Sequence, residues 1–252
     1  MIDEMFQVDE LQQLCGYGLK ICDGLEIRQP TVGDIVKLGE SEYFNMVYTL
    51  TAIPSDMKAQ LDQMGIDWEK IEDFEFFCML VCSLPLSSTS VLFGDKLDFS
   101  QFEIIPLEGT RGCKLVHRSE GVVIDEIRYK AITKYLCDLH GIVKKPQFSG
   151  NAYTHKMQLE MAYEDWERQK RKKKKQEKST LKPLISTMVN MPGFKYNLKE
   201  VLSIGFKEFM DAVARTQVIT STQALLNGCY TGNVDTKKLN KNELNYMRDI
   251  GK

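Results

Sequence analysis

The feature that most constrains this chain is a run of fourteen residues, from Glu167 to Thr180, that contains no apolar side chain. Such a stretch has nothing to bury, so it forms a solvated helix, a linker or a loop rather than part of a core. Apolar residues return directly after it. We therefore predict a mixed domain over residues 1–165, a Lys-rich charged arm or linker over 166–180, and a helical module over 181–252.

The overall composition is that of an ordinary globular protein. Of the 252 residues, 43% are hydrophobic and 27% are charged, which excludes wholesale disorder. The net charge of −2 excludes a protein whose whole surface attracts polyanions, although it allows a local basic patch. No stretch approaches the roughly 20 apolar residues of a membrane span, and the acidic N-terminus has no signal-peptide pattern. We expect no membrane partner.

The cysteines predict reduced thiols rather than a metal site. Their number is odd, their spacing is irregular, and no pair forms the CxxC motif that is typical of zinc sites. Cys78 and Cys82 lie four residues apart in an apolar segment, where free cysteine behaves as a small hydrophobe. We therefore expect a reducing compartment, with no metal ligands and no cofactors. The seven cysteines are Cys15, Cys22, Cys78, Cys82, Cys113, Cys137 and Cys229.

The N-terminal part combines turn signals with helical periodicity. Asp23 and Gly24, between alternating apolar residues, predict a β-hairpin, and residues 31–53 and 125–141 have helical patterns. The short runs FEIIPL, CKLVH and GVVI predict a small antiparallel sheet within residues 91–124. The expected fold class is α+β and predominantly helical, with the hairpin, the small sheet and several helices in the N-terminal domain and a small helical bundle at the C-terminus.

An amphipathic helix is expected just before the basic run, and it can continue into that run as a charged arm. Its apolar stripe consists of Leu159, Ala162, Tyr163 and Trp166, and the Lys, Arg, Glu and Gln residues that follow are good helix formers. Three interpretations of the arm stay open: a solvated linker, a contact with an acidic protein surface, and nucleic-acid binding. Its basic residues are Arg168, Lys170, Arg171, Lys172, Lys173, Lys174, Lys175 and Lys178.

The C-terminal module is expected to consist of short helices. Residues 206–218 and 222–230 have amphipathic patterns, and Thr220 and Gln223 have the spacing of a capping box at the start of the second helix. Two interpretations stay open for the apolar stripe of the first helix. It is either the core of the module itself or a partner-binding surface that packs against an apolar helix of another protein. The stripe consists of Phe206, Phe209, Met210 and Val213.

The sequence contains no clear catalytic motif. The P-loop, GxGxxG, HExxH and GxSxG patterns are all absent. Glu208 and Asp211 lie three residues apart, but no histidine or metal-ligand cluster accompanies them, so they are better explained as surface charges. We expect a protein that is not an enzyme and has no catalytic residues.

Three segments resemble proteins from the tail-morphogenesis gene clusters of phages and prophages of Gram-positive bacteria. They are EIRQPTVGDIVKLGESEYFNMVYTLTAIPSDMK, DWEKIEDFEFFCMLV and MPGFKYNLKEVLSIGFKEFMDAVARTQ. The resemblance implies a non-enzymatic tail assembly chaperone that binds the tape-measure protein in the host cytoplasm while the tail tube polymerises.

Two features depart from the small, all-helical chaperones of this class, namely the Lys-rich run and the β-rich residues 91–124. They leave two alternatives open. The first is a nucleic-acid-binding phage protein that acts through the Lys-rich arm, and the second is a structural component of the tail or virion.

Overall fold

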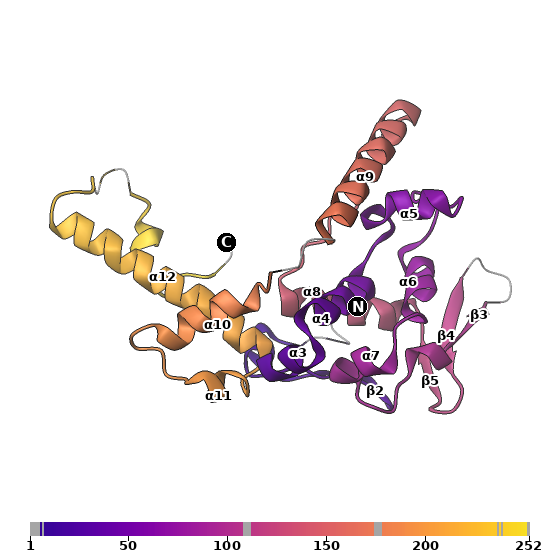
Figure 1. Ribbon diagram of the computed structural model, residues 1–252, viewed down its shortest axis with the longest axis horizontal. Coiled ribbons are helices and arrows are strands. Elements are labelled where there is room, and N and C mark those ends of the chain that lie inside the picture. The colour runs from indigo at the N-terminus through magenta and orange to yellow at the C-terminus, as the bar shows by residue number, and fades with distance from the viewer. Residues whose placement is uncertain are drawn as a thin grey trace.

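The computed structural model confirms a predominantly helical α+β fold (Figure 1). The chain is 56% helical, and its described residues form eleven helices and two small antiparallel sheets. The structure describes residues 6, 8–107, 112–173, 178–235, 237 and 239–250, with only the backbone of residues 172 and 173.

The two sheets form where the sequence predicted them. The hairpin pairs Leu19 with Ile27 and turns at Asp23 and Gly24, where Gly24 has a φ of 83°. Glycine adopts this left-handed conformation without strain. The hairpin strands are β1 (Leu19–Cys22) and β2 (Leu25–Ile27), and the second sheet has the order β3 (Glu103–Pro106), β4 (Cys113–His117) and β5 (Val122–Ile124).

Seven helices build the N-terminal body around these sheets. The helix expected over residues 125–141 is present, because Asp125 caps its start by accepting the N–H of Arg128 and Gly141 ends it in a left-handed conformation. The helices are α2 (Glu10–Leu14), α3 (Val32–Leu38), α4 (Glu40–Thr51), α5 (Lys58–Gln63), α6 (Asp73–Val81), α7 (Leu86–Phe93) and α8 (Glu126–His140). The short 3₁₀ turns are η1 (Pro54–Asp56) and η2 (Phe99–Gln101).

One segment predicted as a single helix, residues 31–53, forms the two helices α3 and α4. Thr31 and Asp34 make the capping box at the start of α3, with hydrogen bonds of 3.1 and 2.9 Å between side chains and backbone N–H groups. At Gly39 the φ angle is 105°, and the chain changes direction before α4 begins. The sequence pattern missed this break because both halves have apolar residues at helical spacing.

The main core lies between α4, α6, α8 and the sheets. Leu50 of α4, Phe77 of α6 and Ile132 of α8 are at most 1% exposed and belong to one cluster of apolar side chains, together with Leu25 of β2 and Leu115 of β4. Helix α6 is apolar around most of its circumference, which suits a position at the centre of this core.

The C-terminal segment contains one long helix where the sequence predicted two short ones. Helix α12 (Phe206–Tyr230) runs without interruption through Thr220 and Gln223, so the predicted capping box is not used. No glycine or proline falls between Phe206 and Asn227 to end the helix earlier. The other elements of this segment are α10 (Leu181–Asn190), α11 (Leu198–Val201) and the 3₁₀ turn η3 (Lys241–Leu244).

The first half of the C-terminal segment packs on the N-terminal body. Leu181 and Phe206 belong to the main core, and Val32 of α3 lies in a second apolar cluster with Phe209 of α12. The backbone N–H of Gly33 donates to the Leu202 carbonyl at 2.8 Å. A Cβ atom at Gly33 would approach that oxygen to 2.5 Å, so the close contact requires glycine. Residues before and after the basic run therefore pack together in the same apolar clusters. The division into domains stays a prediction.

Candidate functional site

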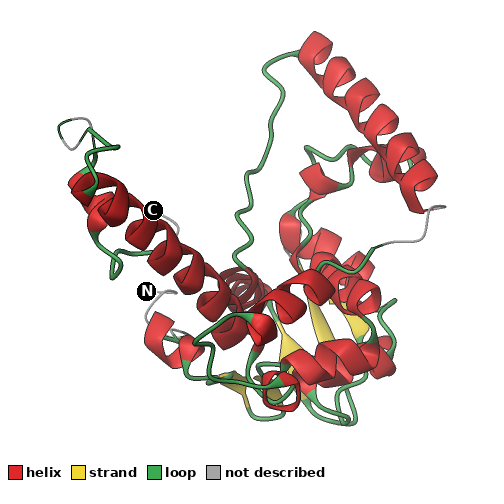
Figure 2. Cartoon of the chain, turned by 60° about the vertical axis from the view of Figure 1, so that its left-hand side comes forward, coloured by secondary structure: helices red, strands yellow, loops and turns green. Residues whose placement is uncertain are grey.

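Helix α9 (Ala152–Lys173) stands beside the body and forms one wall of a groove. Figure 2 shows it beside α5 at the edge of the molecule, reached from α8 by an extended segment, residues 142–150. Asn151 caps its start by accepting the N–H of Thr154 at 2.9 Å. As predicted, the helix includes the stripe that ends at Trp166 and continues into the basic run.

The groove lies between α9 and the surface made by α4, η1, α5 and the end of α6, and it has a volume of about 1000 Å³. The α9 residues that line it, from Gln158 to Lys170, lie on one helix face. The twelve residue-to-residue steps from Gln158 to Lys170 rise about 18 Å along the helix axis, so the groove is long enough to accommodate a short helix beside α9. Its larger apolar side chains are Tyr48, Met57, Leu80, Met161 and Trp166.

Lys58 is a buried lysine in the lining of this groove, and it connects three segments of the chain. It is 5% exposed, and its Nζ donates hydrogen bonds to Oε1 of Gln147 at 2.5 Å and to Oε1 of Gln158 at 3.0 Å. The same ammonium lies 4.5 Å from the centre of the Trp68 ring. Burial lowers the pKa of Lys58 below its ordinary value. This side chain therefore joins α5, the extended segment and α9.

A second lysine holds the extended segment against α4 and η1. The Nζ of Lys144 lies 2.6 Å from Oδ2 of Asp56 and 5.3 Å from the centre of the Tyr48 ring. The Tyr48 hydroxyl donates to the Asp56 carbonyl at 3.3 Å. Burial, followed by the nearby Asp56 charge, raises the pKa of Tyr48 to about 12, so this hydroxyl is neutral at physiological pH.

The first basic residues of the run are paired within α9. Arg168 lies 3.1 Å from Glu164 and 3.3 Å from Asp165, and Lys170 lies 2.9 Å from Glu167. These pairs span three or four residues along one helix, where exposed ion pairs contribute only about 0.3–0.5 kcal/mol each. They neutralise part of the charge that the sequence suggested was available to a partner.

The remaining basic residues of the run are only partly described by the structure. The Nζ of Lys170 also lies 3.6 Å from the centre of the Trp166 ring, and Arg171 and Lys178 are exposed. Only the backbone of Lys172 and Lys173 is described, while Lys174 and Lys175 lie outside the described residues. Directly after the run, Glu40 of α4 accepts hydrogen bonds from Ser179, Thr180 and Leu181, so the run connects two parts that are both attached to the body.

The structure does not place the predicted partner-binding residues on the surface. Phe206 is 4% exposed, Phe209 is 0% exposed and Val213 is 8% exposed, because they pack against α3, α10 and the main core; Met210 is partly buried between the same clusters. Partner binding by this stripe stays a prediction, because in the folded chain its side chains are turned toward other parts of the same chain. The alternative interpretation, an internal core, describes its position.

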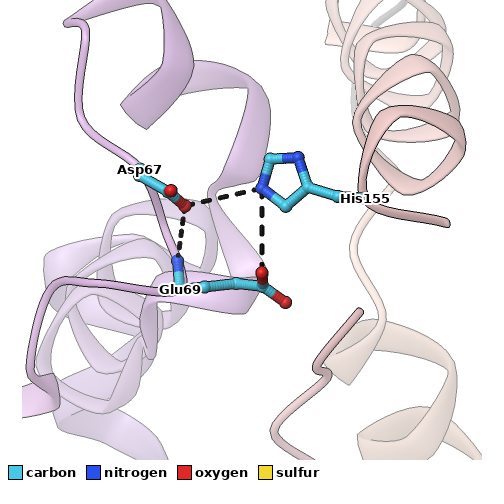
Figure 3. A group of neighbouring side chains, drawn as sticks. All are labelled: Asp67, Glu69 and His155. Carbon is cyan, nitrogen blue, oxygen red and sulfur yellow. Dashed lines mark hydrogen bonds and ion pairs between the residues drawn. The ribbon is translucent and has the colours of Figure 1, made fainter. Parts of the chain in front are cut away.

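Three side chains beside the N-terminal end of the groove form a group that could hold a metal ion (Figure 3). Asp67 and Glu69 belong to the turn after α5, and His155 lies in the first turns of α9. The Nε2 of His155 is 3.4 Å from Oδ1 of Asp67 and 3.9 Å from Oε2 of Glu69. Each residue offers one ligand atom, and these three atoms all lie within 4.8 Å of one another.

Sequence analysis missed this group for a physical reason. Asp67 and Glu69 lie in a turn, where Oδ1 of Asp67 accepts the N–H of Glu69 at 3.1 Å, and α6 begins only at Asp73, so no helical periodicity marks these two residues. The spacing Asp-x-Glu was the available signal, but nothing in the sequence brings His155 to it. The seven cysteines, which Sequence analysis weighed as possible metal ligands, are all free thiols in the structure.

Comparisons with known protein families, with curated proteins and with solved structures found no match to this chain. No helix in the described parts is long and apolar enough to cross a membrane.

Proposed function

We propose that this protein is a non-enzymatic binding protein that holds an amphipathic helix of its partner in the groove along α9. The groove itself is the observation that carries the proposal. Its wall and floor present thioether and aromatic side chains, Met57, Met161 and Trp166, beside amide and hydroxyl groups. Methionine adapts to varied apolar surfaces, and this mixture suits the apolar stripe and polar flanks of a helix.

The charge distribution favours an acidic partner. Between Arg168 and Lys178 there are eight basic residues and one acidic residue, a net charge of +7, so the rest of the chain carries −9. The basic residues adjoin the groove at Lys170. A concentrated positive charge accelerates association with an acidic segment, while the apolar contacts determine how long the complex lasts.

The partner that we propose is the tape-measure protein of a phage tail, as the resemblance of the sequence implies, and the role is that of a tail assembly chaperone. A tape-measure protein needs its long amphipathic helices covered until the tube encloses them. A groove open to solvent suits this task because the bound helix can be released. The proposed location is the host cytoplasm.

Co-expression with the tape-measure protein of the same phage tests this function. We expect the tape-measure protein to become soluble and to co-purify with this chain. A tape-measure protein that stays insoluble would contradict the chaperone role, and recovery of this chain from finished particles would support a structural tail component instead.

A variant with Lys172–Lys175 changed to Gln distinguishes the proposed function from nucleic-acid binding. The chaperone role predicts slower association at low salt and unchanged solubilisation of the partner. A nucleic-acid-binding role predicts that the original chain retains DNA or RNA at low salt and that the variant loses this retention, with a shallower salt dependence. That result would contradict the proposed function.

A further inference from the structure

Asp67, Glu69 and His155 differ from an ordinary surface ion pair in the position of the histidine nitrogen. The Nε2 of His155 is buried and makes no hydrogen bond to any described residue, although it lies 3.4 Å from an Asp67 oxygen. Figure 3 shows the imidazole directed between the two carboxylates. An imidazole nitrogen and two carboxylate oxygens are typical ligands of divalent transition metals.

The distances suit a single ion. Tetrahedral Zn²⁺ with bonds of about 2.0–2.1 Å places its ligand atoms about 3.3 Å apart. The pair formed by His155 and Asp67 is separated by 3.4 Å, and the pair formed by His155 and Glu69 by 3.9 Å. All three ligand atoms lie within 4.8 Å of one another, so shifts of up to about 1.5 Å in the two carboxylates complete the arrangement, which is within side-chain mobility.

Neighbouring residues orient the histidine and Glu69. The ring of His155 stacks on Trp68 with 11° between the planes, which fixes its rotation. Glu69 accepts hydrogen bonds from the backbone N–H and the hydroxyl of Ser149, the latter at 2.8 Å. Groups that orient ligands in this way strengthen metal binding.

The two oxygens of Asp67 have different neighbours: Oδ2 lies beside a lysine, and Oδ1, which also accepts the Glu69 N–H, faces the histidine. The Nζ of Lys70 lies 2.9 Å from Oδ2 of Asp67, whereas Oδ1 is the oxygen that lies toward His155. In the described part of the chain, no other set of three His, Cys, Asp or Glu side chains comes together in this way.

We propose that Asp67, Glu69 and His155 bind a divalent transition-metal ion, Zn²⁺ foremost, which fastens the first turns of α9 to the turn after α5. The imidazole favours Zn²⁺ over Mg²⁺ and Ca²⁺, which prefer oxygen ligands. Two carboxylates balance the charge of the ion. The ion holds one end of the groove wall in place, and this inference does not depend on what occupies the groove.

The test uses the full chain without a histidine tag and in metal-free buffer. The chain has two tryptophans, so a Trp166→Phe background leaves Trp68, next to His155, as the only indole, and its emission is followed with excitation that does not excite tyrosine. Paramagnetic Co²⁺ bound at the site should quench Trp68, and Zn²⁺ should reverse the quenching at one equivalent. Calorimetric titration with Zn²⁺ gives the affinity directly.

Two variants remove one ligand each with little change in shape. His155→Phe keeps an aromatic ring on Trp68, and Glu69→Gln keeps an acceptor for Ser149. We expect each to weaken Zn²⁺ binding by about 100-fold or more. The control is Glu160→Gln, which removes an exposed carboxylate of α9 whose ion pair with Lys156 is long, at 4.0 Å. We expect the Zn²⁺ affinity of this control to match that of the original chain.

Three results would overturn the proposal. The first is equal Zn²⁺ affinity in His155→Phe and the original chain. The second is a sulfur-to-cobalt charge-transfer band in the Co²⁺ complex, which would place the ion on cysteine thiolates. The third is a Zn²⁺ dissociation constant weaker than about 1 mM, an affinity of about 4 kcal/mol, which would leave the three residues as an ion pair only.

Discussion

The imidazole of His155 lies against the indole of Trp68, with 11° between the ring planes and 5.7 Å between the ring centres. This contact joins the first turns of α9 to the turn after α5, next to the buried ammonium of Lys58. Tyr163, about two helical turns further along α9, makes a second contact, because its hydroxyl donates to Asp62 of α5 at 2.8 Å. The wall of the groove is therefore attached to the body at its N-terminal end.

Changing Ser149 to Ala should weaken Zn²⁺ binding without removing a ligand. The hydroxyl of Ser149 donates to Glu69 at 2.8 Å, and loss of an orienting group of this kind reduces metal affinity by about 10-fold or more. Calorimetric titration measures the change. Ser203→Ala serves as the control, because the Ser203 hydroxyl is exposed and bonds only to the Lys199 carbonyl. Equal affinities in the two variants would argue against an orienting role for Ser149.

Changing Phe209 to Ala should destabilise the fold by about 3–5 kcal/mol, the usual cost of removing a buried aromatic side chain. Phe209 is 0% exposed and packs in the cluster that contains Val32 of α3. Urea denaturation measures the loss. Leu198→Ala, at a side chain that is 54% exposed, should cost less than about 1 kcal/mol. A loss below about 1 kcal/mol at Phe209 would mean that this residue is not part of the core.

Stability should fall as the pH is lowered from about 6.5 to about 4, partly because of His140. Burial, followed by the Lys207 charge, lowers the pKa of His140 from 6.5 to about 4, and its Nε2 shares a 3.0 Å hydrogen bond with the Tyr43 hydroxyl. Between these pH values the unfolded chain binds the extra proton, so protonation favours unfolding by up to about 3 kcal/mol.

The His140→Gln variant isolates this effect. We expect its stability, measured by urea denaturation across the same pH range, to decline less steeply than that of the original chain. The difference between the two should level off below the folded pKa of about 4. Parallel curves for the two proteins would show that His140 is not the group responsible.

Changing Glu40 to Gln should loosen the attachment of the C-terminal segment by about 1 kcal/mol. Burial alone would raise the pKa of Glu40, but hydrogen bonds from Ser179, Thr180 and Leu181 together hold it below its usual value. Glu40 therefore stabilises the fold above its ordinary pKa of 4.5, and this contribution is lost as the pH falls through the folded value.

Urea denaturation at neutral and acidic pH measures the effect of Glu40→Gln, with the exposed Glu26→Gln as the matched control. The difference between Glu40→Gln and the original chain should shrink at acidic pH. A difference that grows as the pH falls would contradict the role of the Glu40 carboxylate.

Local signals in the sequence were sufficient for most of the secondary structure. Asp23 and Gly24 determine the hairpin, Asp125 and Gly141 bound α8, and the stripe that ends at Trp166 identifies α9. Each depends on residues close together in the chain, where capping, turn geometry and periodicity act directly.

The site depends on contacts between distant segments, which periodicity does not reveal. His155 meets Asp67 and Glu69 only because the extended segment carries α9 back along α5. Likewise, an apolar stripe such as that of Phe206 and Phe209 looks the same whether it faces the chain's own core or a partner. In both cases tertiary packing decides the outcome, and the sequence pattern does not.

The most direct test of the proposed groove is the binding of a labelled acidic amphipathic peptide of about 15 residues from the tape-measure protein, followed by fluorescence anisotropy. Met161 lines the groove and is 61% exposed, whereas Met64 is 63% exposed and lies outside its lining, so the two are matched in chemistry and exposure. We predict that Met161→Glu weakens binding by about 10-fold or more, equivalent to about 1.4 kcal/mol, and that Met64→Glu changes it by less than about 2-fold. Equal effects of the two variants, or no binding to the original chain, would contradict the account.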